Sequence, residues 1–153
     1  MSHTTILLNT HTSAVSQFFN HPANSACVFN GELIFATDSG VYKSAGDFDG
    51  EDNIDAHFTL PQSNFGYNGQ KSLRSMVVGG YINGSITATV SDEKGASRDY
   101  ISKEMDQTDG CKLALRSDQR SRYFTTTISN VDGADFSIDT VDVTFIPGSE
   151  RRR

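Results

Sequence analysis

Apolar and polar residues alternate strictly in the middle of the chain, after the pair Asn83-Gly84. Within Ile86–Val90 every second side chain is apolar and the ones between are threonines. Such a period of two is typical of a strand with one buried face in an antiparallel sheet. We therefore predict which side chains lie on each face: Ile86, Ala88 and Val90 inward, Thr87 and Thr89 outward.

Turn residues divide the chain into short strands of this kind. Asn-Gly between apolar runs predicts a two-residue hairpin, because both residues tolerate positive φ. We expect such hairpins at Asn30-Gly31 and at Asn83-Gly84, and a further turn at Asp92–Gly95. For Gly79-Gly80 a bulge at a strand end is the preferred interpretation, and close approach of a ligand is the alternative.

The last strand changes its apolar parity. Phe136 and Ile138 occupy even positions, whereas Val141, Val143 and Phe145 occupy odd ones. A regular strand cannot move its apolar set to the other face, so this pattern predicts a β-bulge near Asp139-Thr140.

About ten short strands at regular spacing, with no convincing long helix, predict an all-β fold. We expect an antiparallel β-sandwich, jelly-roll-like or immunoglobulin-like, with a closed β-barrel as the alternative. The expected organisation is an N-terminal arm over residues 1–25 and one sandwich domain over residues 26–153.

Three connections are expected between these strands. Residues 45–55 and 103–110 are predicted as polar loops, and Pro61 is predicted to end a strand over residues 54–60. Residues 62–70 carry Phe65 and Tyr67, which we expect to fold back over the sheet.

Composition excludes several function classes. The 153 residues contain 13 Lys and Arg, 19 Asp and Glu and 2 Cys, and an acidic chain is a poor general binder of nucleic acid. No apolar run approaches the ~20 residues of a membrane span. Cys27 and Cys111 match no zinc pattern, and we expect two thiols that are not bonded to each other.

An acidic loop is the most tempting ligand site. Crowded carboxylates suit calcium, but the spacing departs from the EF-hand pattern, and a charged run in a loop is usually solvated. The carboxylates concerned are Asp47, Asp49, Glu51, Asp52 and Asp55. No other metal ligands, no cofactor motif and no catalytic constellation are found.

Both ends of the chain suggest contacts with other molecules. The arm holds Ile6, Leu7, Leu8, Phe18 and Phe19 in a stretch with little pattern of its own. Leaving such side chains in water is costly, so either they pack between copies or the arm folds onto its own sandwich. The terminal Arg151-Arg152-Arg153 is either a solvated end or an electrostatic contact with the acidic half of a neighbouring copy.

Two long segments resemble tail proteins of tailed bacteriophages and prophages. They read AHFTLPQSNFGYNGQKSLRSMVVGGYINGSITATVSDEKGASRDY and LRSDQRSRYFTTTISNVDGADFSIDTVDV. The resemblance covers about residues 26–153 and contains no enzyme motif. It implies a non-enzymatic virion building block of the tail or its distal end, assembled in the host bacterial cytoplasm. The implied partners are itself and other tail proteins, without a cofactor. A carbohydrate-binding sandwich for host-surface glycans is the alternative, weakened by the absence of Trp.

Overall fold

The computed structural model describes residues 4–19, 23–46, 48–49, 52–116 and 118–148. All regular structure in these residues is β-strand, and the chain forms two compact units, residues 1–46 and 47–153. The first unit contains β1 (Thr4–Leu8), β2 (Val15–Phe19), β3 (Ser25–Phe29), β4 (Glu32–Thr37) and β5 (Gly40–Lys43). The second contains β6 (Phe48–Asp49), β7 (Asp52–Asn53), β8 (His57–Ser63), β9 (Lys71–Gly84), β10 (Ile86–Asp92), β11 (Ser97–Ile101), β12 (Met105–Ala114), β13 (Arg120–Ser121), β14 (Phe124–Asn130) and β15 (Asp135–Pro147).

The division between the units differs from the division expected from sequence. Residues 26–46, which we expected in the sandwich, belong to the first unit together with residues 1–25. The physical reason is pairing: β3, β4 and β5 form an open three-stranded meander, and among the described strands they share no ladder with the later ones.

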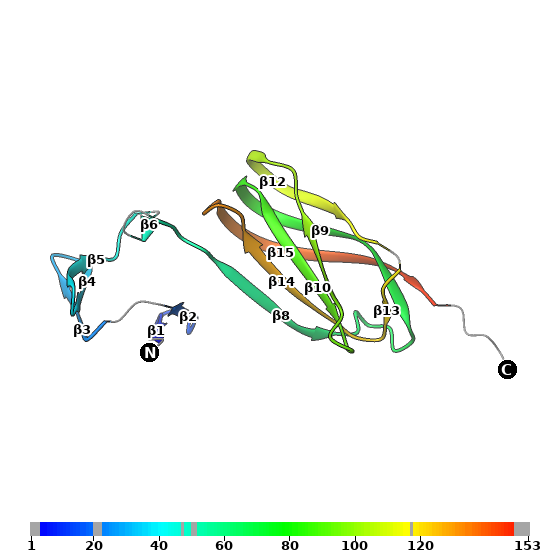
Figure 1. Ribbon diagram of the computed structural model, residues 1–153, viewed down its shortest axis with the longest axis horizontal. Helices are drawn as coiled ribbons and strands as arrows, with labels where there is room; N and C mark the ends of the chain where they lie inside the picture. Colours follow the sequence, from blue (N-terminus) through cyan, green and yellow to red (C-terminus); the bar gives the residue numbers. More distant parts are fainter. Residues whose placement is uncertain (1–3, 20–22, 47, 50–51, 117, 149–153) are drawn as a thin grey trace. The chain divides into compact units, whose positions relative to one another are not determined.

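The second unit is an antiparallel sandwich of two four-stranded sheets. One sheet has the order β11-β10-β14-β8. The other has β9 at its centre, with β12 and β13 on one side and β15 along the other (Figure 1). Among the described strands, no sheet closes into a barrel. The predicted all-β class and antiparallel sandwich are therefore confirmed.

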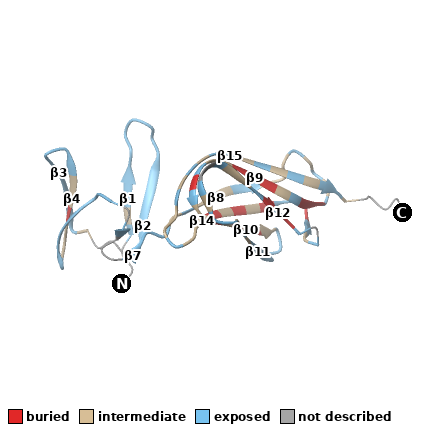
Figure 2. Cartoon of the chain, turned by 90° about the horizontal axis from the view of Figure 1, so that it is seen from above, coloured by how far each residue is buried: buried red, intermediate tan, exposed pale blue. Residues whose placement is uncertain are grey.

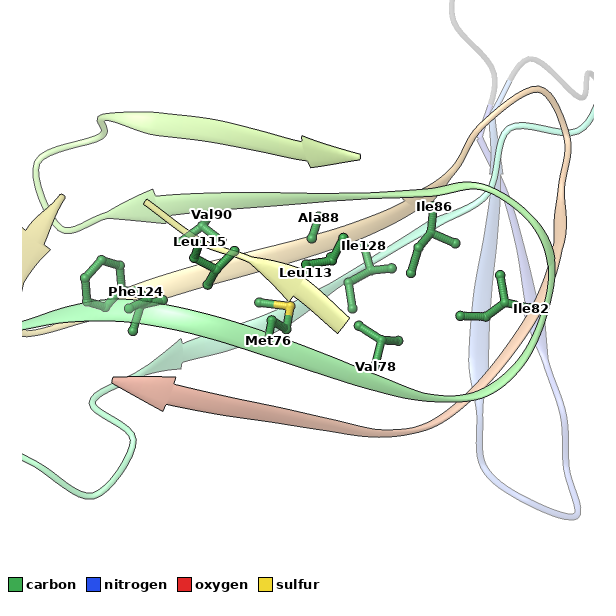
Figure 3. Close-up of a cluster of buried hydrophobic side chains, with 11 residues drawn as sticks. Met76, Val78, Ile82, Ile86, Ala88, Val90, Leu113, Leu115, Phe124 and Ile128 are labelled. Carbon is green, nitrogen blue, oxygen red and sulfur yellow. The ribbon is translucent and has the colours of Figure 1, made fainter. Parts of the chain in front are cut away.

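The core lies between these two sheets. In Figure 3 the buried side chains of β9 and those of β10 and β14 point toward one another. As predicted, the apolar set of β10 is buried, while Thr87 and Thr89 lie on the opposite face, half-buried. The core residues are Leu73, Met76, Val78, Ile82, Ile86, Ala88, Val90, Leu113, Leu115, Phe124 and Ile128.

The predicted bulge is present in β15. Ile138 pairs with Gly80 and Thr140 with Gly79, so Asp139 has no partner in the β9 ladder. This extra residue moves the apolar set from even to odd positions while keeping it on the core side. Phe136, Ile138, Val141, Val143 and Phe145 are all partly buried against the core.

Two expected turns are hairpins. Asn30 and Gly31 have φ of 51° and 81° and join β3 to β4, as a type I′ turn requires. At the β10–β11 turn, the Asp92 carboxylate oxygen Oδ1 accepts hydrogen bonds from the backbone N–H groups of Lys94 and Ala96.

The expected hairpin at Asn83-Gly84 is wrong. β9 and β10 belong to different sheets, so these residues carry the chain from one layer to the other. A type I′ turn requires positive φ at both residues, but of this pair only Gly84 has it, with φ of 114°.

Three boundaries also differ from expectation. Pro61 lies inside β8 at a register shift, which is possible because β8 is an edge strand. Residues 105–110, expected as loop, belong to β12, which pairs irregularly with β9. The acidic segment carries the short pair β6–β7.

Candidate interaction surface

The hairpin β1–β2 gathers apolar side chains on both of its faces. The register pairs Ile6 with Gln17 and Leu8 with Val15. Because cross-strand partners share a face and neighbours along a strand alternate, Ile6, Leu8, Val15 and Phe19 share one face. The other face carries Leu7 and Phe18.

The first of these faces is largely uncovered. Its four apolar residues are between 56% and 64% exposed, whereas Leu7 and Phe18 on the other face are 39% and 43% exposed. Figure 2 shows β1 and β2 coloured almost entirely as exposed. Among the described strands, β1 and β2 pair only with each other, so each also keeps one unpaired edge.

The meander β3–β4–β5 presents apolar residues on both faces as well. Val28 faces the same side as Leu33, its partner in β4, and Tyr42 faces the same side as its partner Phe35. Leu33 and Phe35 lie two positions apart in β4, so these side chains share one face. Val28 and Tyr42 are exposed, and Phe35 is the one buried hydrophobic residue among the described residues of the first unit.

The opposite face of this meander is equally apolar. Phe29 is the partner of Glu32, and Val41 is the partner of Ala36, which places both beside the even-numbered residues of β4. Phe29 is 66% exposed and Val41 73% exposed. An ion pair between Glu32 and Lys43 links β4 and β5 on this face.

We call the exposed apolar residues of the two sheets the N-terminal apolar surface: Ile6, Leu7, Leu8, Val15, Phe18, Phe19, Val28, Phe29, Val41 and Tyr42.

The structure brings together the five arm residues that the sequence singled out. Ile6, Leu7, Leu8, Phe18 and Phe19 all lie on the β1–β2 hairpin. Sequence reasoning missed Val15, although its spacing from Phe19 fits a strand. It also missed the exposed residues of β3 and β5, because a hairpin signal says nothing about burial. Arg151, Arg152 and Arg153 lie outside the described residues.

The acidic segment does not form a complete ligand shell in the described residues. Asp49 and Asp52 are partners in the β6–β7 pair, and Asp55 follows β7, while Asp47 and Glu51 lie outside the described residues. Within the part of the chain that is described, no group of three or more His, Cys, Asp or Glu side chains is placed to hold a metal ion.

An open cleft of about 860 Å³ lies at one end of the sandwich. Three segments line it. They are residues 83–85 where β9 passes into β10, residues 104–106 at the start of β12, and residues 131–134 between β14 and β15. Three carboxylates line it, those of Glu104, Asp106 and Asp132, with no histidine, lysine or cysteine among the lining residues. Ser85 adds one hydroxyl to the lining.

Lys71 is fully buried, and its ammonium group donates its hydrogen bonds to backbone carbonyls. Its Nζ donates to the backbone carbonyls of Tyr67 at 2.8 Å, Gly69 at 3.4 Å and Arg122. The ammonium also lies 5.6 Å and 5.8 Å from the ring centres of Tyr67 and Phe145.

These contacts show what Lys71 does. Three donors meet three acceptors, so it fixes the 64–70 connection and the segment before β14 to the start of β9. Burial lowers the pKa of Lys71, and the nearby Glu93 carboxylate opposes that shift. The predicted return of residues 62–70 over the sheet is confirmed: Phe65 packs on the core, and the Tyr67 ring stacks on Phe145.

The two cysteines are free thiols in different units. Cys27 is exposed in β3, and Cys111 is half-buried in β12, where burial raises the pKa of its thiol. No described helix has the length and apolar character needed to cross a membrane.

Comparison with known proteins adds no relative: no family model, no curated protein and no solved structure matches the chain. The N-terminal apolar surface is the structural feature that bears on function, because exposed apolar patches mark sites of interaction.

Proposed function

We propose that this chain is a non-enzymatic structural protein of a bacteriophage or prophage tail, acting through contacts with copies of itself and with other tail proteins. The observation that carries the proposal is the N-terminal apolar surface. Ten large hydrophobic residues are exposed in a unit of 46 residues. Large exposed apolar patches mark sites of protein–protein contact.

A further feature supports an assembly role. The buried core and the satisfied Lys71 lie entirely within residues 47–153, so the N-terminal apolar surface is not part of that core. The resemblance of residues 26–153 to tail proteins is the reason why we propose a phage tail as the assembly.

The carbohydrate-binding alternative has less support. Sugar sites on sandwiches need aromatic rings presented together, as flat apolar platforms. Among the described residues of the second unit, the exposed aromatic residues are Phe48 in β6, Tyr81 in β9 and Tyr123 before β14, and these three strands belong to three different sheets.

Purified virions test the proposal. Phage particles induced from a bacterium that encodes this chain would be separated into heads and tails and quantified by mass spectrometry. We expect peptides of the chain in the tail fraction at a fixed ratio to the other tail proteins. A stop codon early in the reading frame should remove it and yield defective tails. Its absence from particles made by the unaltered phage would refute the proposal.

A further inference from the structure

Three Asn-Gly pairs occur in the chain, and the fold places them in different surroundings. They are Asn30-Gly31, Asn68-Gly69 and Asn83-Gly84, and each follows a large apolar or aromatic residue. Asparagine before glycine is open to deamidation, because glycine has no side chain to hinder the attack of its nitrogen on the asparagine amide. The backbone must still rotate to bring the two groups together, so the structure decides which pair can react.

Asn30-Gly31 is the least constrained of the three pairs. It forms the two-residue turn of the β3–β4 hairpin, beyond the last ladder pair, Phe29 with Glu32. Both turn residues are exposed, and a Cβ placed on Gly31 would meet no atom within 4 Å. Within the described part of the chain, the Asn30 side-chain amide has no hydrogen-bond partner. Rotation in this turn therefore breaks no side-chain contact.

Asn68-Gly69 lies in a connection that is held in place. The Asn68 side-chain oxygen Oδ1 accepts a hydrogen bond from the Asn64 side chain at 2.7 Å. Lys71 Nζ donates to the backbone carbonyls on either side of Asn68, those of Tyr67 and Gly69. The Tyr67 hydroxyl fills the space beside Gly69, 2.6 Å from where a Cβ would lie. Rotation at Asn68 would disturb all of these contacts.

Asn83-Gly84 is fixed by strand pairing on both sides. Asn83 pairs with Asp135 of β15, and Gly84 pairs with Met105 of β12. The Ala134 side chain lies 2.6 Å from where a Cβ of Gly84 would be. Reaction at this pair requires the end of β9 to separate from its neighbours.

We propose that Asn30 is a site of spontaneous deamidation and that the product loosens the β3–β4 hairpin. The Gly31 backbone nitrogen loses its proton to a base in solution and attacks the Asn30 Cγ. A C–N bond forms, and the side-chain nitrogen leaves as ammonia. Water then opens the resulting succinimide ring at either of its carbonyls, which gives aspartate or isoaspartate. No electrons are transferred, and water is the co-reactant.

The isoaspartate product adds one methylene to the backbone of a turn with fixed geometry. Asn30 and Gly31 have φ of 51° and 81°, as the two-residue turn requires. The turn sets the register of a hairpin, so lengthening it disturbs the pairing of β3 with β4. Both products also add a carboxylate to a unit whose charged side chains are Glu32, Asp38 and Lys43.

Peptide mapping of the full chain during incubation at mildly alkaline pH tests this selectivity. Trypsin places the three pairs in separate peptides, residues 1–43, 44–71 and 75–94, in which tandem mass spectrometry localises each lost amide. We expect deamidation at Asn30 to be about tenfold faster or more than at Asn68 or Asn83, because those sites must first open several hydrogen bonds. In concentrated guanidinium chloride, where the fold is lost, the three rates should approach one another.

Asn30→Gly is the matched control, because glycine keeps the positive φ of the turn and has no amide to lose. Deamidated and unmodified chains differ by one negative charge, so anion exchange separates them. We expect faster hydrogen–deuterium exchange in β3 and β4 of the deamidated chain, with β9 and β10 unchanged. The same incubation should leave exchange in Asn30→Gly unaltered.

Several outcomes would overturn the proposal. One is deamidation of Asn68 or Asn83 in the folded chain as fast as that of Asn30. Another is an Asn30 that stays intact in the folded chain while the denatured chain reacts. A preference for Asn30 that is equally large in guanidinium chloride would show that the fold does not set the rate. Equal exchange of β3 and β4 in deamidated and unmodified chains would refute the loosening of the hairpin.

Discussion

Gly80 provides the sharpest test of how the sandwich is built. It lies in β9 opposite the β15 bulge with φ of 133°. A Cβ at this position would lie 2.1 Å from the Ser137 carbonyl oxygen and 2.9 Å from the Ile138 Cα. Both are backbone atoms, so no side-chain rotation relieves the clash. Gly80→Ala must therefore push β15 away from β9.

The cost can be worked from these contacts. The unfavourable backbone conformation contributes about 1–3 kcal/mol. Separating the strands weakens neighbouring ladder hydrogen bonds at about 0.5–1.5 kcal/mol each. We expect Gly80→Ala to lower the free energy of unfolding by about 4 kcal/mol, which corresponds to a fall in Tm of about 15 °C for a unit of this size.

Gly95→Ala is the matched control. Gly95 also has positive φ, 84°, in the β10–β11 turn of the same unit, but a Cβ there meets no atom within 4 Å. Only the left-handed backbone is penalised, by about 1–2 kcal/mol. Thermal and urea unfolding monitored by circular dichroism would compare the two variants. If Gly80→Ala is no more destabilising than Gly95→Ala, the close packing at the bulge is refuted.

Two other predictions concern buried ionisable groups. Lys71→Met should lower the free energy of unfolding by about 2–4 kcal/mol, because three backbone carbonyls lose their donor. Since the pKa of Lys71 is lowered in the fold, the unfolded chain binds more protons between that lowered pKa and 10.5. Unfolding free energy should then rise with pH up to that value, and the gap to Lys71→Met measured by urea titration should widen; a constant gap contradicts this. Cys27 and Cys111 should remain unbonded, so non-reducing mass spectrometry should show no two-hydrogen deficit. Because burial raises the pKa of Cys111, its alkylation near neutral pH should be slower than that of free cysteine.

Sequence predicted those features that depend on local pattern. The alternation in β10 identified its buried face, and the parity change in β15 located the bulge at Asp139. Both inferences hold because a strand has a fixed period of two, so the residues themselves record which face is buried.

Features that depend on distant pairing could not be predicted. Asn83-Gly84 has the residue types of a hairpin turn, but whether its flanking strands pair or cross between sheets is decided by β12, β14 and β15. Lys71 resembles a surface residue in sequence, yet carbonyls from Tyr67 and Arg122 enclose it. The exposure of the apolar residues of β3 and β5 was not predicted either, because a hairpin pattern identifies turns and pairing and carries no information on what covers a face.

Hydrogen–deuterium exchange on the full chain tests most directly whether assembly covers the N-terminal apolar surface. Amides of β1–β5 would be followed by mass spectrometry at micromolar concentration and after about hundredfold dilution, with β9 and β10 of the sandwich core as the internal reference. We expect slow exchange in β1–β5 at the higher concentration and rapid exchange after dilution, while β9 and β10 remain protected throughout. Exchange in β1–β5 that is equally rapid at both concentrations, or equally slow at both, would contradict it.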